Sequence, residues 1–187
     1  MALIDKYLPV FQFNERHQLL VDAVPAGLLD AVTLSDTSDD PWVRTFIRLR
    51  ELPDRFLGAL GRGGVLKNRA AFGLTDFTLL GRDSDREIVF GLVGKFWQFD
   101  YGLVAIDDSE EFERFTAVGV PKLVLNFRVE SLDNGHARLL TETRVFCNDR
   151  KSFIRSLPYW WMIRPVSGLM RRRLLVRIRN AAAARAN

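Results

Sequence analysis

SFIRSLPYWWMIRPVSGLMRRRLLVRIRNAAAA, residues 152–184, is the longest helical pattern in this sequence. Its apolar residues recur at steps of three and four, at Phe153, Leu157, Trp160, Trp161, Ile163, Val166, Met170, Leu174, Ile178, Ala181 and Ala182. This spacing draws one apolar stripe along a long α-helix. A stripe of this length needs a long surface to cover it, and the segments upstream predict that this surface is a sheet.

The first turns of the predicted helix are rich in aromatic residues, with Tyr159, Trp160, Trp161 and Met162 in succession. Two interpretations stay open: the aromatic residues form the wall or mouth of a ligand cavity, or they are ordinary core packing. Pro165 follows and removes one helix hydrogen bond, so a kink or restart is expected over 164–168.

Upstream of this helix the sequence reads mainly as strands. The predicted strands are Glu15–Asp22, Phe72–Leu80, Glu87–Val93, Lys95–Leu103, Glu111–Val118, Lys122–Ser131 and Ala137–Cys147. Short helices are expected over 24–32 and 42–50, followed by a glycine-rich link over 58–64 that we expect to be a mobile lip. Residues 81–85 and 107–109 are predicted turns. Consecutive strands joined by short turns favour an antiparallel sheet, and therefore an α+β fold.

The last two strands form a hairpin whose register follows from the sequence. A two-residue loop at Asn134-Gly135 would place Glu142 opposite Phe127. A three-residue loop with a left-handed glycine pairs Phe127 with Thr141 and keeps one face apolar. We therefore predict the second register. It points Thr141 and Thr143 inward and points Glu142 and Arg144 outward, as a charge ladder with Arg128 and Glu130.

Length and composition indicate a single globular domain over residues 1–187, with 48% hydrophobic residues. The single cysteine, Cys147, fits a reducing compartment, and the N-terminus lacks a signal-peptide pattern, so we expect a cytoplasmic protein. No apolar run is long enough to span a membrane. His17 and His136 are far apart and Cys147 has no nearby ligand partner, so neither a metal nor another cofactor is predicted.

Positive charge is concentrated in the predicted C-terminal helix. Residues 148–187 contain ten Arg or Lys side chains and one acid, Asp149. One interpretation is binding to an anionic membrane surface through Arg171, Arg172, Arg173 and Arg177, with nucleic acid less favoured. The other is that these arginines keep the outer face of a long helix solvated and complement its C-terminal dipole.

The order of elements resembles the helix-grip fold of the START-like, or SRPBCC, superfamily. That superfamily includes lipid-transfer domains, the birch-pollen-allergen group and aromatic polyketide cyclases. Three stretches are similar to an uncharacterised bacterial branch: Asn126–Glu130 (NFRVE), Thr141–Val145 (TETRV), and Tyr159-Trp160 followed by Ile163-Arg164-Pro165 and Ser167-Gly168. The resemblance implies a curved sheet of six or seven strands around the C-terminal helix, with an apolar cavity between them.

Two main functions are compatible with such a cavity. In the first, the protein binds a small hydrophobic ligand such as a lipid, a polyketide or an aromatic molecule. Strand parity and the helix stripe suggest the lining residues Phe90, Trp97, Phe127, Thr141, Thr143, Tyr159 and Trp160. In the second, the protein is an enzyme of the cyclase or dehydratase type. A buried carboxylate, with Asp76 and Asp100 as candidates, would then move protons without a metal.

Overall fold

The structure, a computed structural model, describes residues 2–21, 28–30, 32, 76–98, 101–133 and 136–186. Its helices are α1 (Ile4–Tyr7), α4 (Ser109–Arg114) and α5 (Arg150–Ala186), and its strands are β1 (Phe13–Val21), β2 (Thr78–Asp83), β3 (Glu87–Gly94), β4 (Leu103–Val104), β5 (Lys122–Ser131) and β6 (Ala137–Phe146). Most of the expected helix over 24–32, the whole of the one over 42–50 and the glycine-rich link lie outside the described residues.

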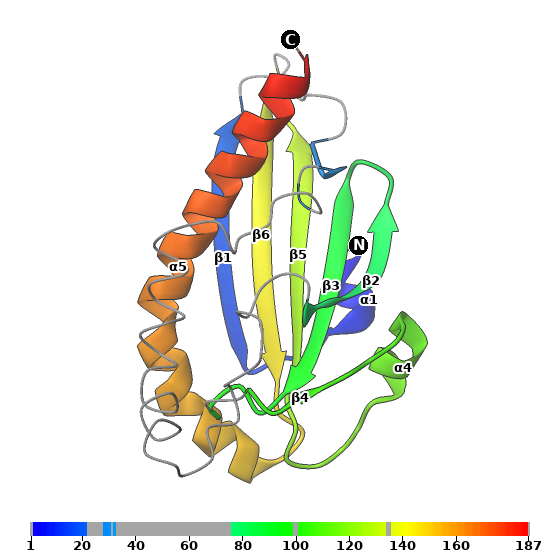
Figure 1. Ribbon diagram of the computed structural model, residues 1–187, viewed down its shortest axis with the longest axis vertical. Coiled ribbons are helices and arrows are strands. Elements are labelled where there is room, and N and C mark those ends of the chain that lie inside the picture. Colours follow the sequence, from blue (N-terminus) through cyan, green and yellow to red (C-terminus); the bar gives the residue numbers. More distant parts are fainter. Residues whose placement is uncertain are drawn as a thin grey trace, which may run out of the picture.

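The six described strands form one antiparallel sheet in the order β1-β6-β5-β3-β2, with β4 paired to β3. Helix α5 runs along the length of the sheet against β1 and β6 (Figure 1). We call the side of the sheet that it covers the α5 face. Helix α1 packs on β5 and α4 packs on β2 and β3, on the opposite face. The expected α+β class and the long C-terminal helix are therefore confirmed.

Each face of the sheet has its own apolar core, because alternate residues of a strand point to opposite sides. On β3, Ile88 and Phe90 pack with Leu175 and Ile178 of α5. Val89 and Val93 of the same strand pack instead with residues of α1 and α4. All eight residues of β3 are buried, as expected for a strand covered on both sides.

The register predicted for the last hairpin is confirmed. Phe127 pairs with Thr141, Val129 with Leu139, and Glu130 with Arg138. Asn134 and Gly135 lie outside the described residues.

The strand predicted over 95–103 is wrong. The chain turns twice there, with Gln98 N donating to Lys95 O and Tyr101 N donating to Gln98 O. Tyr101 and Gly102 both have positive φ, at 62° and 45°, which reverses the chain. Only Leu103 and Val104 return to the sheet, as β4.

The strand predicted over 111–118 is also wrong, because residues 111–114 belong to helix α4. Asp108, which we interpreted as part of a turn, is the N-cap of α4 and accepts from Glu111 N at 2.8 Å. Glu111 Oε2 in turn accepts from Asp107 N at 2.7 Å. The arrangement resembles a capping box, except that the Glu111 side chain accepts from the residue before the N-cap rather than from the N-cap itself.

Two element boundaries also differ from those expected. β2 continues through Gly81 to Asp83, and the turn falls at 84–86. Helix α5 does not restart at Pro165 but is helical from Arg150 to Ala186. Its first turns cross the lower end of the sheet in Figure 1 before the helix rises along β1. None of the described helices is both long and apolar enough to cross a membrane.

Candidate functional site

The α5 face carries a group of polar side chains in the middle of otherwise apolar surroundings. We call it the Glu15 cluster, and its members are Glu15, His17, Thr141, Thr143 and Arg171. β1 supplies the first two residues, β6 supplies both threonines, and α5 supplies the arginine. Along β1 and β6, the cluster lies between the two apolar cores of the α5 face.

Strand pairing brings the four strand residues of the cluster together. Glu15 is directly opposite Thr143, and His17 is directly opposite Thr141. Glu15 Oε1 lies 2.8 Å from His17 Nε2, a hydrogen-bonded ion pair when the imidazole is protonated. The exposed fractions are 6% for Glu15, 1% for Thr141 and 2% for Thr143.

Gly168 of α5 lies directly over the Glu15–His17 pair. A β-carbon at this position would come within 3.1 Å of Glu15 Oε1 and 3.2 Å of His17 Cε1. The missing side chain therefore lets the helix approach the two polar groups closely. It also explains a glycine in a helix interior, where glycine costs about 1 kcal/mol relative to alanine.

Arg171 follows Gly168 by about one helical turn and reaches toward the sheet. Its Nη1 donates to Thr141 Oγ1 at 3.5 Å, which is at the long end of hydrogen bonding. Burial lowers the pKa of Arg171 to about 10, and the Glu15 carboxylate opposes that shift. The guanidinium therefore remains charged at neutral pH.

Thr143 stands out within the cluster because its hydroxyl is buried and has no hydrogen-bond partner. A buried hydroxyl without a partner costs about 1–3 kcal/mol. Glu15 lies directly opposite Thr143 on the neighbouring strand, β1. An unsatisfied hydroxyl beside a buried carboxylate can bond a polar group of a bound molecule.

Aromatic side chains border the cluster on the side of the α5 N-terminus. Phe13 stacks on Phe153 with ring centroids 5.4 Å apart, and Trp160 lies 5.3 Å from Phe13. Tyr159 and Trp160 are half-buried members of this core. Tyr159 and Trp160, two of the residues that we expected to line a cavity, therefore lie on the α5 face.

The remaining predicted lining residues are divided between core and periphery. Phe90 and Phe127 are buried in the core toward the C-terminal half of α5, with ring centroids 6.4 Å apart. Trp97 is half-buried at the turn after β3 rather than on a strand. Its neighbour Phe96 is buried.

Of the two carboxylates proposed for catalysis, Asp76 is not part of the Glu15 cluster. Asp76 is half-buried just before β2 and lines a pocket of about 490 Å³ with residues of β3 and β4. Asp100 lies outside the described residues. The inward carboxylate that sequence reasoning missed is Glu15. The signal was the alternation of Phe13, Glu15, His17, Leu19 and Val21 along β1.

The opposite face of the sheet holds Glu142 and Arg144, which point away from α5 as predicted. They do not form the expected ladder with Arg128 and Glu130. Glu142 instead accepts hydrogen bonds from Asn14, Arg16 and Arg144. Arg144 bonds Asp5 and the Leu8 carbonyl, both in the N-terminal segment. This network therefore anchors the N-terminal segment to the sheet.

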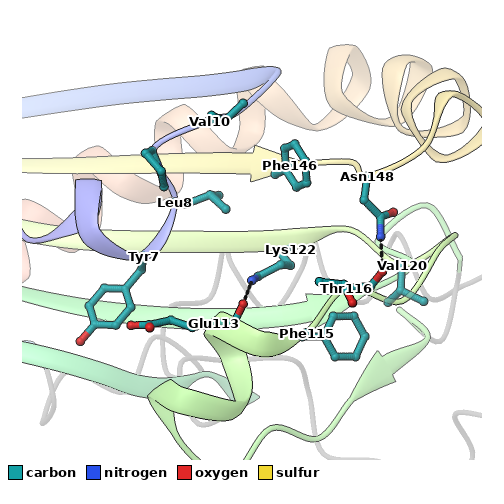
Figure 2. Close-up of a pocket in the computed structure, with 11 residues that line it drawn as sticks. Tyr7, Leu8, Val10, Glu113, Phe115, Thr116, Val120, Lys122, Phe146 and Asn148 are labelled. Atoms are coloured by element: carbon teal, nitrogen blue, oxygen red, sulfur yellow. Dashed lines mark hydrogen bonds between the residues drawn. The ribbon is translucent and has the colours of Figure 1, made fainter.

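A second pocket, of about 240 Å³, lies on that opposite face between the N-terminal segment and the loop after α4 (Figure 2). Its lining is mostly apolar, with Tyr7, Leu8, Val120 and Phe146 among the residues drawn. Burial lowers the pKa of Lys122 there, and Lys122 Nζ donates to the Glu113 carbonyl. Its lysine and Asn148 both bond backbone carbonyls of the protein.

Among the described residues, no group of three or more His, Cys, Asp or Glu side chains is placed to hold a metal ion. The Glu15–His17 pair supplies two such side chains. Cys147 is a free, buried thiol whose pKa is raised by burial.

Comparisons with known proteins leave the family open. No protein-family model matches the chain, and no curated protein matches it. A solved structure of a hypothetical protein from Helicobacter pylori aligns with 95% of this chain and 93% of its own, at 11% sequence identity. The TM-score of that alignment is 0.38.

Proposed function

We propose that the protein binds a small hydrophobic ligand between α5 and the sheet, beside the Glu15 cluster. The observation that carries the proposal is the buried, unpartnered hydroxyl of Thr143 next to Glu15. Apolar side chains on both sides of the cluster suit the hydrocarbon part of a ligand. The cluster suits a single hydroxyl or carbonyl group, because sites of this kind combine an apolar lining with a few placed polar groups.

The arrangement we propose is a helix-grip fold of the START-like kind, in which the sheet curves around α5. Support comes from the antiparallel sheet order, the long C-terminal helix and the position of α5 against β1 and β6. We also propose a cytoplasmic location, in keeping with the free thiol of Cys147.

The ligand is tested by native mass spectrometry of the protein purified from its own host. We expect a bound mass that is released when the protein is denatured. Uptake of cis-parinaric acid, a fluorescent fatty acid, provides a second readout. We expect Thr143→Val to weaken this uptake and Thr143→Ser, which keeps the hydroxyl, to retain it. A protein that carries no ligand and takes up no probe would contradict the proposal.

A second candidate function is acid–base catalysis at the same place. The observation in its favour is the hydrogen bond between Glu15 and His17, which places two titratable groups together under α5. Glu15 then takes the role that the sequence suggested for Asp76 or Asp100, and the reaction class is proton transfer next to a carbonyl, as in cyclases and dehydratases.

Proton transfer can be detected without knowing the substrate. Acetylacetone, a small diketone, would be incubated with the protein in deuterated water, and exchange of its central protons would be followed by NMR. Exchange above the buffer rate that disappears in Glu15→Gln would support catalysis. Equal rates with and without protein would leave ligand binding as the better account.

A further inference from the structure

The outward side of α5 carries large apolar side chains that nothing in the described structure covers. The exposed fractions are 55% for Ile154, 66% for Trp161, 64% for Met162 and 50% for Leu169. Ile154 and Trp161 are seven residues apart, as are Met162 and Leu169, and seven residues make two helical turns. The four side chains therefore share one side of the helix, and we call them the α5 apolar row.

This row lies opposite the side of α5 that packs on the sheet. Ser152, Ser156, Leu174 and Ile178 are buried on the packed side. The apolar row therefore does not belong to the stripe that fills the core. Of the apolar positions that the sequence assigned to one stripe, Trp161 lies on the outward side.

The charged residues of α5 itself are all basic. Lys151, Arg155, Arg164 and Arg172 are exposed on α5. The helix contains no Asp or Glu from Arg150 to Ala186. Arg171 is not part of this surface, because it reaches toward Thr141.

A neighbouring loop adds another apolar group near the start of the helix. Val118 has an exposed fraction of 77%. The loop is tied to the helix start, since Gly119 N donates to Asp149 Oδ2 at 2.9 Å and Asn148 Nδ2 donates to the Thr116 carbonyl at 2.8 Å. The exposed valine therefore lies on a loop anchored beside the first turn of α5.

We infer that the α5 apolar row docks on the surface of an anionic lipid bilayer. Trp161 and Met162 enter the boundary between headgroups and acyl chains, while Lys151, Arg155 and Arg172 contact lipid phosphates. A helix with an apolar row between basic residues has the composition of an interfacial helix. Tryptophan favours this depth because its ring is apolar and its N–H is polar.

The charge pattern favours a bilayer over nucleic acid and over a second copy of the chain. Nucleic acid would satisfy the basic residues but leave Trp161 and Met162 in water. A second copy of the chain would bring the same basic residues face to face, at a cost in repulsion. Of these three surfaces, only the anionic bilayer satisfies both the apolar and the basic groups.

The test is cosedimentation of the full chain with vesicles of phosphatidylcholine, with or without phosphatidylserine. We expect binding to the anionic vesicles that weakens as salt rises, and little binding to phosphatidylcholine alone. The double variant Trp161→Glu, Met162→Glu should lose more than about tenfold in affinity. The double variant Lys151→Gln, Arg155→Gln should lose about fivefold for each charge removed.

A matched control separates the row from general surface hydrophobicity. Leu20 and Leu79 are exposed to 62% and 52%, on β1 and β2. Leu20→Glu, Leu79→Glu makes the same change in charge away from α5, and we expect no more than about twofold loss, from repulsion by the anionic surface. Circular dichroism and thermal unfolding establish that each variant is folded. Quenching of tryptophan fluorescence by brominated lipid should disappear in Trp161→Phe.

Three results would overturn the inference. The first is equal binding to both kinds of vesicle, or no binding. The second is equal loss of binding in the α5 variant and in the control variant. The third is a dimer, detected by sedimentation without vesicles, that dissociates in the double variant Trp161→Glu, Met162→Glu. The α5 apolar row would then pack against a second copy of the chain. Ligand uptake is measured separately, so neither proposal depends on the outcome of the other.

Discussion

Glu15 and His17 lie on the same side of β1, with Glu15 Oε1 2.8 Å from His17 Nε2, directly beneath Gly168 of α5. Residues two apart on a strand share a face, so the pair follows from the strand itself. Its functional interest is that Glu15 is buried and His17 is partly buried beneath the helix. A carboxylate, an imidazole, a guanidinium and two hydroxyls together interrupt an otherwise apolar contact.

Replacing the unpartnered hydroxyl should separate stability from binding. Thr143→Val removes a buried polar group that has no partner. We expect the free energy of unfolding to rise by about 1 kcal/mol, because a desolvation cost is relieved. Urea denaturation followed by circular dichroism measures this. A fall in stability would mean that the hydroxyl is satisfied in solution, for instance by a bound water.

Gly168 should tolerate little added volume. Gly168→Leu places a side chain against Glu15 and His17, which a β-carbon alone already approaches at 3.1 and 3.2 Å. We expect a loss of about 1–3 kcal/mol in the free energy of unfolding, as for overpacked cores. Leu169→Gly, which removes an exposed neighbour from the same helix, serves as the control and should cost only about 1 kcal/mol. Equal losses of stability in the two variants would mean that α5 does not pack closely against Glu15 and His17.

Arg144 should be the most costly single arginine to replace on the face opposite α5. Its side chain is 6% exposed and bonds Glu142, Asp5 and the Leu8 carbonyl, and its guanidinium lies 4.6 Å from the ring centroid of Phe11. Arg144→Met leaves the Glu142 carboxylate short of a partner, so we expect a loss of about 3–5 kcal/mol.

The control for that change is Arg128→Met. Arg128 pairs with Glu130 at the surface, where its side chain is 42% exposed. Exposed ion pairs contribute about 0–1 kcal/mol, so the control should remain close to the wild type in thermal unfolding. A small effect of Arg144→Met would contradict the view that this network anchors the N-terminal segment.

Stability should fall in acid because several carboxylates have lowered pKa values. Burial alone would raise the pKa of Glu142, but hydrogen bonds from Arg144 and Arg16 lower it overall from 4.5. Hydrogen bonds from Arg144 and Ser152 likewise lower the pKa values of Asp5 and Asp149 from 3.8. A carboxyl with a lowered folded-state pKa stabilises the protein above its unfolded pKa, and the effect is lost as pH falls through the folded value.

We therefore expect that these carboxyls leave the free energy of unfolding constant just above about pH 4.5. Below that pH, their protonation should lower it. Denaturation with urea across this range measures the decline. In Glu142→Gln the decline should be smaller, because glutamine has no carboxyl group that binds a proton as the pH falls. An unchanged pH profile in that variant would show that Glu142 is not a source of the acid sensitivity.

Local sequence patterns predicted correctly the features that depend on residues close together in the chain. The strand alternation and the short loop of the last hairpin specify one register, and the pairing of Phe127 with Thr141 confirms it. The pattern over 95–103 was misleading, because two consecutive residues with positive φ override its apolar alternation. The segment over 111–118 was misleading because the capping role of Asp108 was interpreted as a turn.

The sequence alone determined the α+β class, the antiparallel hairpin and the long C-terminal helix, since each follows from residue periodicity. The tertiary structure alone decided which polar groups meet. Glu15 and Arg171 are 156 positions apart in the chain and come together only because α5 packs across β1. It also decided that Trp161 faces outward while Trp160 faces the sheet, because neighbouring helical residues differ by about 100° and only the packed neighbour determines which side is covered.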